Sequence, residues 1–192
     1  MKFGFLKKST VKNGNTIPNI PRKITGKQEK QHAYCDPFFY INRDPKTMLD
    51  DLEKLAKILY PEKDTDDSTS IFWLKTGKDL FVGLSLYMLE TEEERLKEDH
   101  TAVSSFAVLE KIAVLDDPIN GWLRLKTWIK CTFGKAWENW KKDQYPFRYE
   151  LPEYVKILWD YVNTTDDISF GIYNTFRNPT INQRNQQCVQ AA

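Results

Sequence analysis

Two lysines that directly follow a glycine are the first residues of this sequence that could do chemistry, because such a lysine can hold a nucleotide phosphate. They lie in the Thr-Gly-Lys triplets at residues 25–27 and 76–78. A phosphate-binding loop also needs a glycine five positions before this glycine, and Ser or Thr after the lysine. Those positions hold Pro21 and Gln28 in one case, and Phe72 and Asp79 in the other. Because the loop depends on the positive φ angle of glycine, both triplets are interpreted as a turn or a small residue at a helix contact.

Other reactive residue types are also present, but not at the spacing that their chemistry needs. The two histidines, His32 and His100, have no cysteine or histidine at ligand spacing for zinc. Residues 83–87 lack the second glycine of a nucleophile elbow. The acidic run at 64–67 lacks the glycine and the terminal glutamate of a calcium loop. Cys131 is expected in the core rather than as a nucleophile. The sequence therefore predicts no catalytic residue, no metal site and no cofactor.

One segment combines basic and aromatic residues and is a candidate binding surface. Between Arg124 and Lys142 it carries six basic residues and one acidic residue, Glu138, a surplus of +5 (6 − 1). Basic residues mixed with aromatic ones are typical of a surface for nucleic acid or a protein partner. They also occur where a helix simply solvates its outer side, so both interpretations stay open. The candidate partner-binding residues are Arg124, Lys135, Lys142, Trp128 and Trp137.

These candidates need helices to position them, and helical periodicity dominates from residue 34 onward. The sequence predicts helices at about 45–60, 71–90, 101–115, 122–140 and 152–162, and a sixth from about 167 that can restart at Pro179. Asp or Asn directly before proline marks three helix starts, at residues 44, 117 and 178. The third helix is apolar on most sides and is predicted to be central. We expect an all-α fold, a compact bundle of about six or seven helices at 33–192, after an irregular N-terminal arm at 1–32.

The helix at 122–140 has the clearest pattern of the chain. Six residues fall within a narrow arc at 100° per residue and are predicted to point inward: Trp122, Leu125, Ile129, Phe133, Ala136 and Trp140. This places Arg124, Lys135 and Lys142 on the opposite side, where packing does not require them.

Composition limits the class of protein. The 192 residues hold 28 Lys and Arg against 27 Asp and Glu, a net charge of +1. This balance argues against a surface built entirely for phosphate but leaves room for a local basic face. Three scattered cysteines suit a reducing compartment. The apolar stretch at 71–89 contains Lys75, Lys78 and Asp79, too many charges for a membrane span. We therefore expect a soluble chain that does not itself insert into a membrane.

Four stretches, in order along the chain, carry a family resemblance: residues 32–41, 50–61, 72–90 and 169–176. The strongest reads Phe-Trp at 72–73, then Lys-Asp-Leu-Phe-Val-Gly-Leu at 78–84 and Leu-Tyr-Met-Leu-Glu at 86–90. It resembles the Phe-Trp, Ala-Arg-x-Leu-Phe-x-Gly-Leu and Leu-Tyr-Leu-Leu-Glu motifs in the helical domain of the coupling ATPases of type IV secretion and conjugation. Three departures are clear. Gly77-Lys78 replaces Ala-Arg, residues 34–38 read Tyr-Cys-Asp-Pro-Phe for Tyr-Asn-Pro-Leu, and Ile168 replaces an arginine.

The resemblance, over about residues 32–192, implies a substrate-facing helical domain without catalytic machinery. In that family this domain is inserted in a RecA-like motor domain, which carries the ATPase motifs, and lies at the cytoplasmic mouth of a hexamer at the bacterial inner membrane. Implied partners are secreted protein cargo, a relaxase or a secretion chaperone, with attached DNA as a further candidate. The hexamer belongs to the full-length motor, so the chain is interpreted as an excised domain or a split-gene product. The alternative is a free-standing helical nucleic-acid-binding or regulatory protein.

Overall fold

The computed structural model describes residues 36–63, 67–99, 103–142 and 150–190, with side chains up to residue 180. In these ranges seven α-helices and one short 3₁₀ helix form, and no strand occurs. They are η1 (Pro37–Tyr40), α2 (Pro45–Leu59), α3 (Ser68–Glu90), α4 (Glu92–Glu98), α5 (Phe106–Ala113), α6 (Gly121–Lys142), α7 (Glu153–Val162) and α8 (Asp166–Gln190). The predicted all-α class is confirmed. The predicted arm, its boundary at residue 32, and Cys35 lie outside the described residues.

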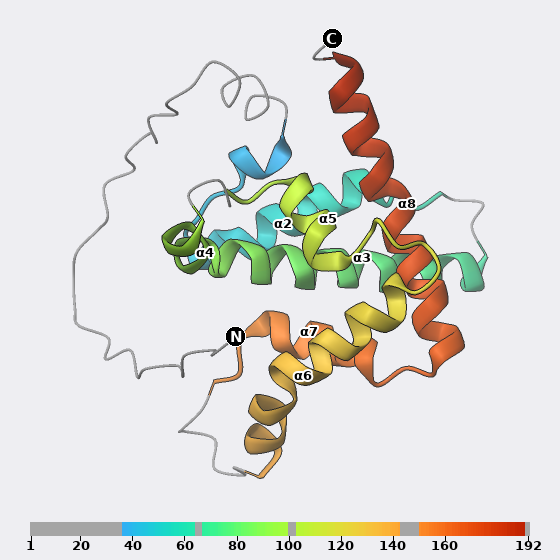
Figure 1. The fold of residues 1–192 in the computed structure, drawn as a ribbon. Helices are drawn as coiled ribbons and strands as arrows, with labels where there is room; N and C mark the ends of the chain where they lie inside the picture. Colours follow the sequence, from blue (N-terminus) through green and yellow to red (C-terminus); the bar gives the residue numbers. More distant parts are fainter. Residues whose placement is uncertain (1–35, 64–66, 100–102, 143–149, 191–192) are drawn as a thin grey trace.

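Helix α3 is the centre of the bundle. It packs against α2, α5, α7 and α8, and Figure 1 shows α2 and α5 on one side of it and α6 and α7 on the other. From Leu80 to Leu89, every residue except Tyr87 is buried. The prediction that the third helix is central was therefore wrong. The reason is that nearly the whole second half of α3 is enclosed, whereas Val103, before α5, is 45% exposed.

A glycine lets α3 and α7 approach each other closely. A Cβ atom added to Gly83 would lie 2.9 Å from Ile157 Cγ2 and 3.1 Å from Leu158 Cδ2. Contacts below 3.0 Å force neighbouring atoms to shift. Gly83 is the glycine of the Phe-x-Gly-Leu motif, so that motif has a packing role here.

The predicted helix at 101–115 is shorter in the structure, because two residues define the ends of α5. The Ser105 hydroxyl caps its start by accepting a hydrogen bond from the Val108 amide, and Val114 ends it with a left-handed backbone, φ 56°. Helix α4, which precedes it, was not predicted. Its sequence, Glu-Glu-Glu-Arg-Leu-Lys-Glu, has a single apolar residue and no apolar period. Polar contacts hold it instead, as described below.

The Asp-Pro and Asn-Pro signals had different outcomes. Asp44 caps α2 directly before Pro45, as predicted. The Asp117 carboxylate accepts hydrogen bonds from the amides of Ile119 and Asn120, but α6 begins only at Gly121, after one turn. Pro179 lies inside α8 and starts no helix. Proline removes one backbone hydrogen bond, and the burial of Ile172, Tyr173, Phe176 and Thr180 on this helix keeps it continuous.

Helix α6 follows its predicted register over most of its length. Leu125, Ile129 and Phe133 are buried, and Trp122 and Ala136 pack partly against the core. Trp140 was predicted to point inward, but it is 38% exposed. It lies beyond the end of the packed surface, and Trp137 makes the last core contact by stacking on Trp159, with ring centroids 5.3 Å apart. Cys131 was expected in the core and is exposed.

Candidate functional site

Lys126 belongs to the interior and not to the basic surface of α6. Its side chain is 6% exposed, and its ammonium group donates to the Thr164 carbonyl oxygen at 2.6 Å and to Ser169 Oγ at 2.9 Å. It also pairs with the Asp166 carboxylate at 3.0 Å. These contacts join α6 to the connection between α7 and α8 and to the first turn of α8. Sequence reasoning counted Lys126 as a surface charge, although it lies one turn after Trp122 and close to the apolar arc.

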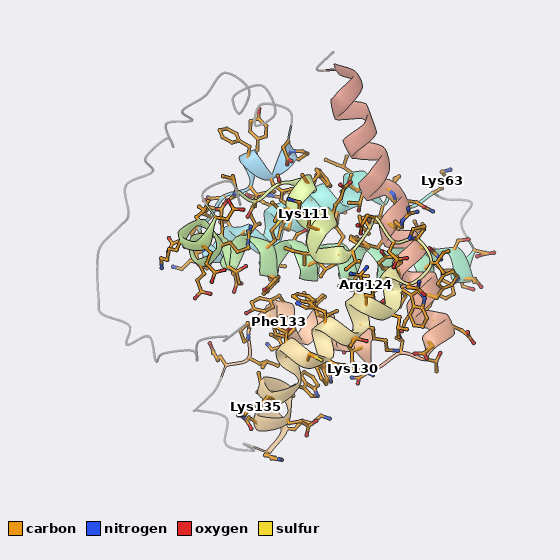
Figure 2. All side chains as sticks on the ribbon, viewed as in Figure 1. Lys63, Lys111, Arg124, Lys130, Phe133 and Lys135 are labelled. Atoms are coloured by element: carbon orange, nitrogen blue, oxygen red, sulfur yellow. The ribbon has the colours of Figure 1, made fainter. Side chains whose placement is uncertain are left out.

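The other basic residues of α6 are exposed: Arg124, Lys130, Lys135, Lys141 and Lys142. At about 100° per residue, Lys135 and Lys142 lie within about 20° of Arg124 around the helix axis. Trp128 lies about 40° from Arg124 on the same side. Four of the five candidates therefore share one face. At about 1.5 Å per residue this face extends roughly 27 Å from Arg124 to Lys142, and Figure 2 shows Lys135 further along the helix from Arg124.

Trp137 is the candidate that lies elsewhere. Its ring stacks on Trp159 and contacts Trp140, with centroids 5.3 and 5.1 Å apart. The Lys141 ammonium nitrogen is 5.7 Å from its ring centroid. Trp137 therefore packs at the end of α6 next to α7, away from the face that holds Arg124 and Trp128.

The face with Arg124 and Trp128 begins at an open pocket of about 380 Å³. Four helices contribute to its wall. Three cationic side chains, two aromatic rings and two aliphatic residues line it: Arg95, Lys111, Arg124, Tyr87, Trp128, Ile112 and Val114. We call it the Arg124 pocket. Figure 2 labels Lys111 on α5 and Arg124 at the start of α6.

The aromatic wall of the Arg124 pocket is held by edge-to-face ring contacts. The Tyr87 ring lies 5.3 Å from Trp128, 5.5 Å from Phe133 and 5.5 Å from Tyr154, measured between centroids. Such contacts favour one ring orientation. Burial raises the pKa of the Tyr87 hydroxyl above its usual value, so this group stays protonated at neutral pH and can donate a hydrogen bond.

Arg95 is fixed by the polar contacts of α4. Its guanidinium donates to the Met88 carbonyl oxygen and to Ser104 Oγ, the latter at 2.8 Å. The Glu92 carboxylate accepts from Arg43 Nε at 3.3 Å and from the Ser104 amide at 2.9 Å. Burial lowers the pKa of Arg95, and the neighbouring Glu92 opposes that shift. These bonds anchor a polar helix to the end of α3 and place one cation in the pocket.

The turn between α5 and α6 is held from α8. The Tyr173 hydroxyl donates to the Val114 carbonyl oxygen at 2.8 Å, and Arg177 Nε donates to the Leu115 carbonyl oxygen at 3.2 Å. The Arg124 guanidinium, in the first turn of α6, lies 3.5 Å from the carboxylate of Asp117, which precedes the helix. The positions of Lys111 and Arg124 relative to each other therefore depend on a fixed turn.

Sequence reasoning found two lining residues of the pocket, Arg124 and Trp128. It missed Tyr87, Arg95 and Lys111, which come from three other helices. Helical periodicity places residues on one helix face but does not bring separate helices together, so no sequence signal marked these three.

In the part of the chain that the structure describes, no group of three or more His, Cys, Asp or Glu side chains could hold a metal ion. Among the same residues, no helix is both long and apolar enough to span a bilayer.

Residues 23–117, about half of the chain, match the family described as type IV secretory system conjugative DNA transfer. No significant match to a curated protein or to a solved structure was found. The match includes three of the four resembling stretches, at 32–41, 50–61 and 72–90, and confirms the predicted family. The fourth stretch, at 169–176, lies outside it and stays a prediction. The match also includes α3, α4 and α5 of the Arg124 pocket, but not α6.

Proposed function

We propose that this chain, which belongs through residues 23–117 to the type IV secretory system conjugative DNA transfer family, recognises the cargo that the secretion system exports. It would contact a relaxase, a secreted effector or a secretion chaperone, with DNA attached to the cargo as a further partner. In this proposal the chain has no catalytic role of its own and works at the cytoplasmic mouth of the motor, at the face of the inner membrane.

The observation that carries this proposal is the exposed positive charge of α6. With Lys126 in the interior, five exposed cations and Glu138 remain on this helix, a surplus of +4 (5 − 1). The whole chain has a net charge of only +1. Arg124, Lys135 and Lys142 share one side, while Leu125, Ile129 and Phe133 make the packing contacts of α6. A concentrated charge that packing does not need is typical of a binding surface.

Charge reversal on this side tests the proposal. The full chain is used as bait in the source cell, and Lys135→Glu/Lys142→Glu is compared with the wild type by mass spectrometry of captured proteins. Lys46→Glu/Lys57→Glu on α2 is the matched control, because it makes the same change of charge at two exposed sites, on a helix that lies on the other side of α3 from α6 (Figure 1). We expect the α6 variant to lose partners that the control keeps. Exposed substitutions usually change stability by within about 0.5 kcal/mol, and thermal unfolding checks this. Identical partners for both variants would refute the proposal.

The same basic helix, with its tryptophans, also supports the second candidate function, direct nucleic-acid binding by a regulatory protein. Salt dependence separates the two. Affinity for nucleic acid falls steeply and log-linearly with salt because each phosphate contact releases a counterion. A protein partner with an apolar centre gives a shallower dependence.

A further inference from the structure

The Arg124 pocket has the chemistry of a site for one small anion next to an apolar group. Its three cations come from three helices, Arg95 from α4, Lys111 from α5 and Arg124 from α6. Planar guanidinium groups match a carboxylate with two parallel hydrogen bonds. Arg124 already pairs with one carboxylate, because its Nη1 lies 3.5 Å from Asp117 Oδ2. That contact leaves other guanidinium N–H groups able to donate.

The surrounding charge disfavours a long polyanion. Residues 92–99 carry five acidic and two basic side chains, a net charge of −3 (2 − 5), and residues 110–117 carry three acidic and one basic, −2 (1 − 3). Both segments border the pocket, since Arg95 and Lys111 belong to them. A nucleic acid places a phosphate every few ångströms along its backbone, so its neighbouring phosphates would meet these carboxylates. A single carboxylate brings one anionic group to the cations that line the pocket, so it meets fewer of these acidic side chains than a polyanion does.

Size and apolar lining point to a peptide. The volume of about 380 Å³ lies at the lower end of ligand pockets and suits one or two side chains. Tyr87 and Trp128 offer half-buried rings, and Ile112 adds an aliphatic side chain. An apolar side chain next to the carboxylate would pack on this wall.

From these observations we infer that the Arg124 pocket binds a carboxylate of a peptide segment, with an adjacent apolar side chain on Tyr87 and Trp128. The carboxylate is either the side chain of Glu or Asp or the carboxyl terminus of the peptide. The biological role of the site rests on the proposed function, because the peptide would belong to the recognised cargo. The binding itself is measurable without that premise.

The test follows the indole N–H signal of Trp128 by NMR in the ¹⁵N-labelled full chain, assigned with Trp128→Phe. Four probes are titrated: acetyl-Leu-Glu-Leu-Glu-Leu-amide, acetyl-Leu-Gln-Leu-Gln-Leu with a free carboxyl terminus, the same glutamine peptide as its amide, and a nine-residue oligothymidylate. We expect at least one carboxylate peptide to shift the Trp128 signal with saturation and the uncharged amide to leave it unchanged. The comparison of the first two identifies the source of the carboxylate.

Two variants locate the binding. Lys111→Gln/Arg124→Gln should lower the affinity for the carboxylate peptide about tenfold or more, since a charge-assisted hydrogen bond commonly contributes a factor of ten to affinity. Lys130→Gln is the control, an exposed lysine of α6 that does not line the pocket. The inference is overturned if neither carboxylate peptide shifts Trp128 at about 10 mM, a concentration that detects mM affinities, if the uncharged amide binds equally well, or if the double variant binds like the control. If only the oligothymidylate shifts the Trp128 signal, the ligand of the pocket is nucleic acid and not a peptide.

This experiment and the capture experiment fail independently. If the Lys135→Glu/Lys142→Glu variant loses partners but no carboxylate peptide binds, the proposed function stands and the Arg124 pocket has no part in it. If a carboxylate peptide binds but the captured partners are unchanged, the Arg124 pocket is a binding site, and its assignment to cargo recognition is refuted.

Discussion

Replacing Lys126 tests whether this buried lysine of α6 stabilises the fold, whereas the exposed lysines of the same helix do not. Lys126→Met keeps most of the side-chain length and apolar stem but removes the ammonium group. The Thr164 carbonyl oxygen then loses the donor that lies 2.6 Å away. Ser169 Oγ keeps other partners, because it donates to the Thr165 carbonyl oxygen at 2.9 Å and shares a hydrogen bond with Thr164 Oγ1 at 2.7 Å.

The magnitude follows from which partners are left unsatisfied. A buried acceptor that loses its donor costs about 1–3 kcal/mol. Asp166 contributes little, because its side chain is 73% exposed and water replaces the ammonium group there. One effect works in the other direction. The wild-type fold spends free energy to move the Lys126 ammonium group out of water, and the methionine variant avoids this cost. We therefore expect Lys126→Met to lower the free energy of unfolding by about 1–3 kcal/mol, and the Tm by roughly 2–12 °C for a chain of this size.

Urea and thermal unfolding, both followed by circular dichroism, provide the measurement, and Lys130→Met is the matched control. It makes the same substitution one helical turn later, at an exposed position, and should stay within about 0.5 kcal/mol of the wild type. Asp166→Asn should cost less than about 1 kcal/mol. Equal stability of Lys126→Met and Lys130→Met would refute the reasoning that Lys126 anchors α6 to the α7–α8 connection.

Two further predictions concern the packing of the bundle. Gly83→Ala should destabilise the chain by up to about 2 kcal/mol, because the overpacking cost of about 1–3 kcal/mol against Ile157 and Leu158 is offset by about 1 kcal/mol from the higher helix propensity of alanine. Gly134→Ala, whose Cβ would meet only Trp159 at 3.5 Å, should be neutral or stabilising in the same urea titration. Burial raises the pKa of Tyr173 from 10.0 to about 12, so the unfolded chain loses this proton first and the free energy of unfolding should fall as pH rises from about 10 towards 12. Tyr173→Phe should fall less steeply over that range, and an unchanged slope would contradict the assignment.

Periodicity in the sequence predicted the helices whose stability comes from an apolar face. Helices α2, α3, α6 and α7 lie close to their expected ranges because each buries apolar residues at helical spacing. Helix α4 could not be found in this way, since its place depends on Glu92, which binds Arg43 and the Ser104 amide, far from it in sequence. Pro179 misled for the opposite reason. Tertiary burial of its neighbours outweighs the local preference of proline to begin or end a helix.

The Arg124 pocket depends on contacts that no local pattern contains. Arg124 and Trp128 could be nominated because they share a face of one helix, and α6 alone sets that relation. Tyr87, Arg95 and Lys111 join them only after Arg95 ties α4 to the Met88 carbonyl oxygen of α3, and after Tyr173 ties down the turn at Val114. The three walls from α3, α4 and α5 lie within the residues that match the family, and the fourth wall, α6, lies outside them. The matched half therefore cannot form this pocket alone, and any recognition through it requires α6 to be docked by Lys126 and by the aromatic contacts of Phe133.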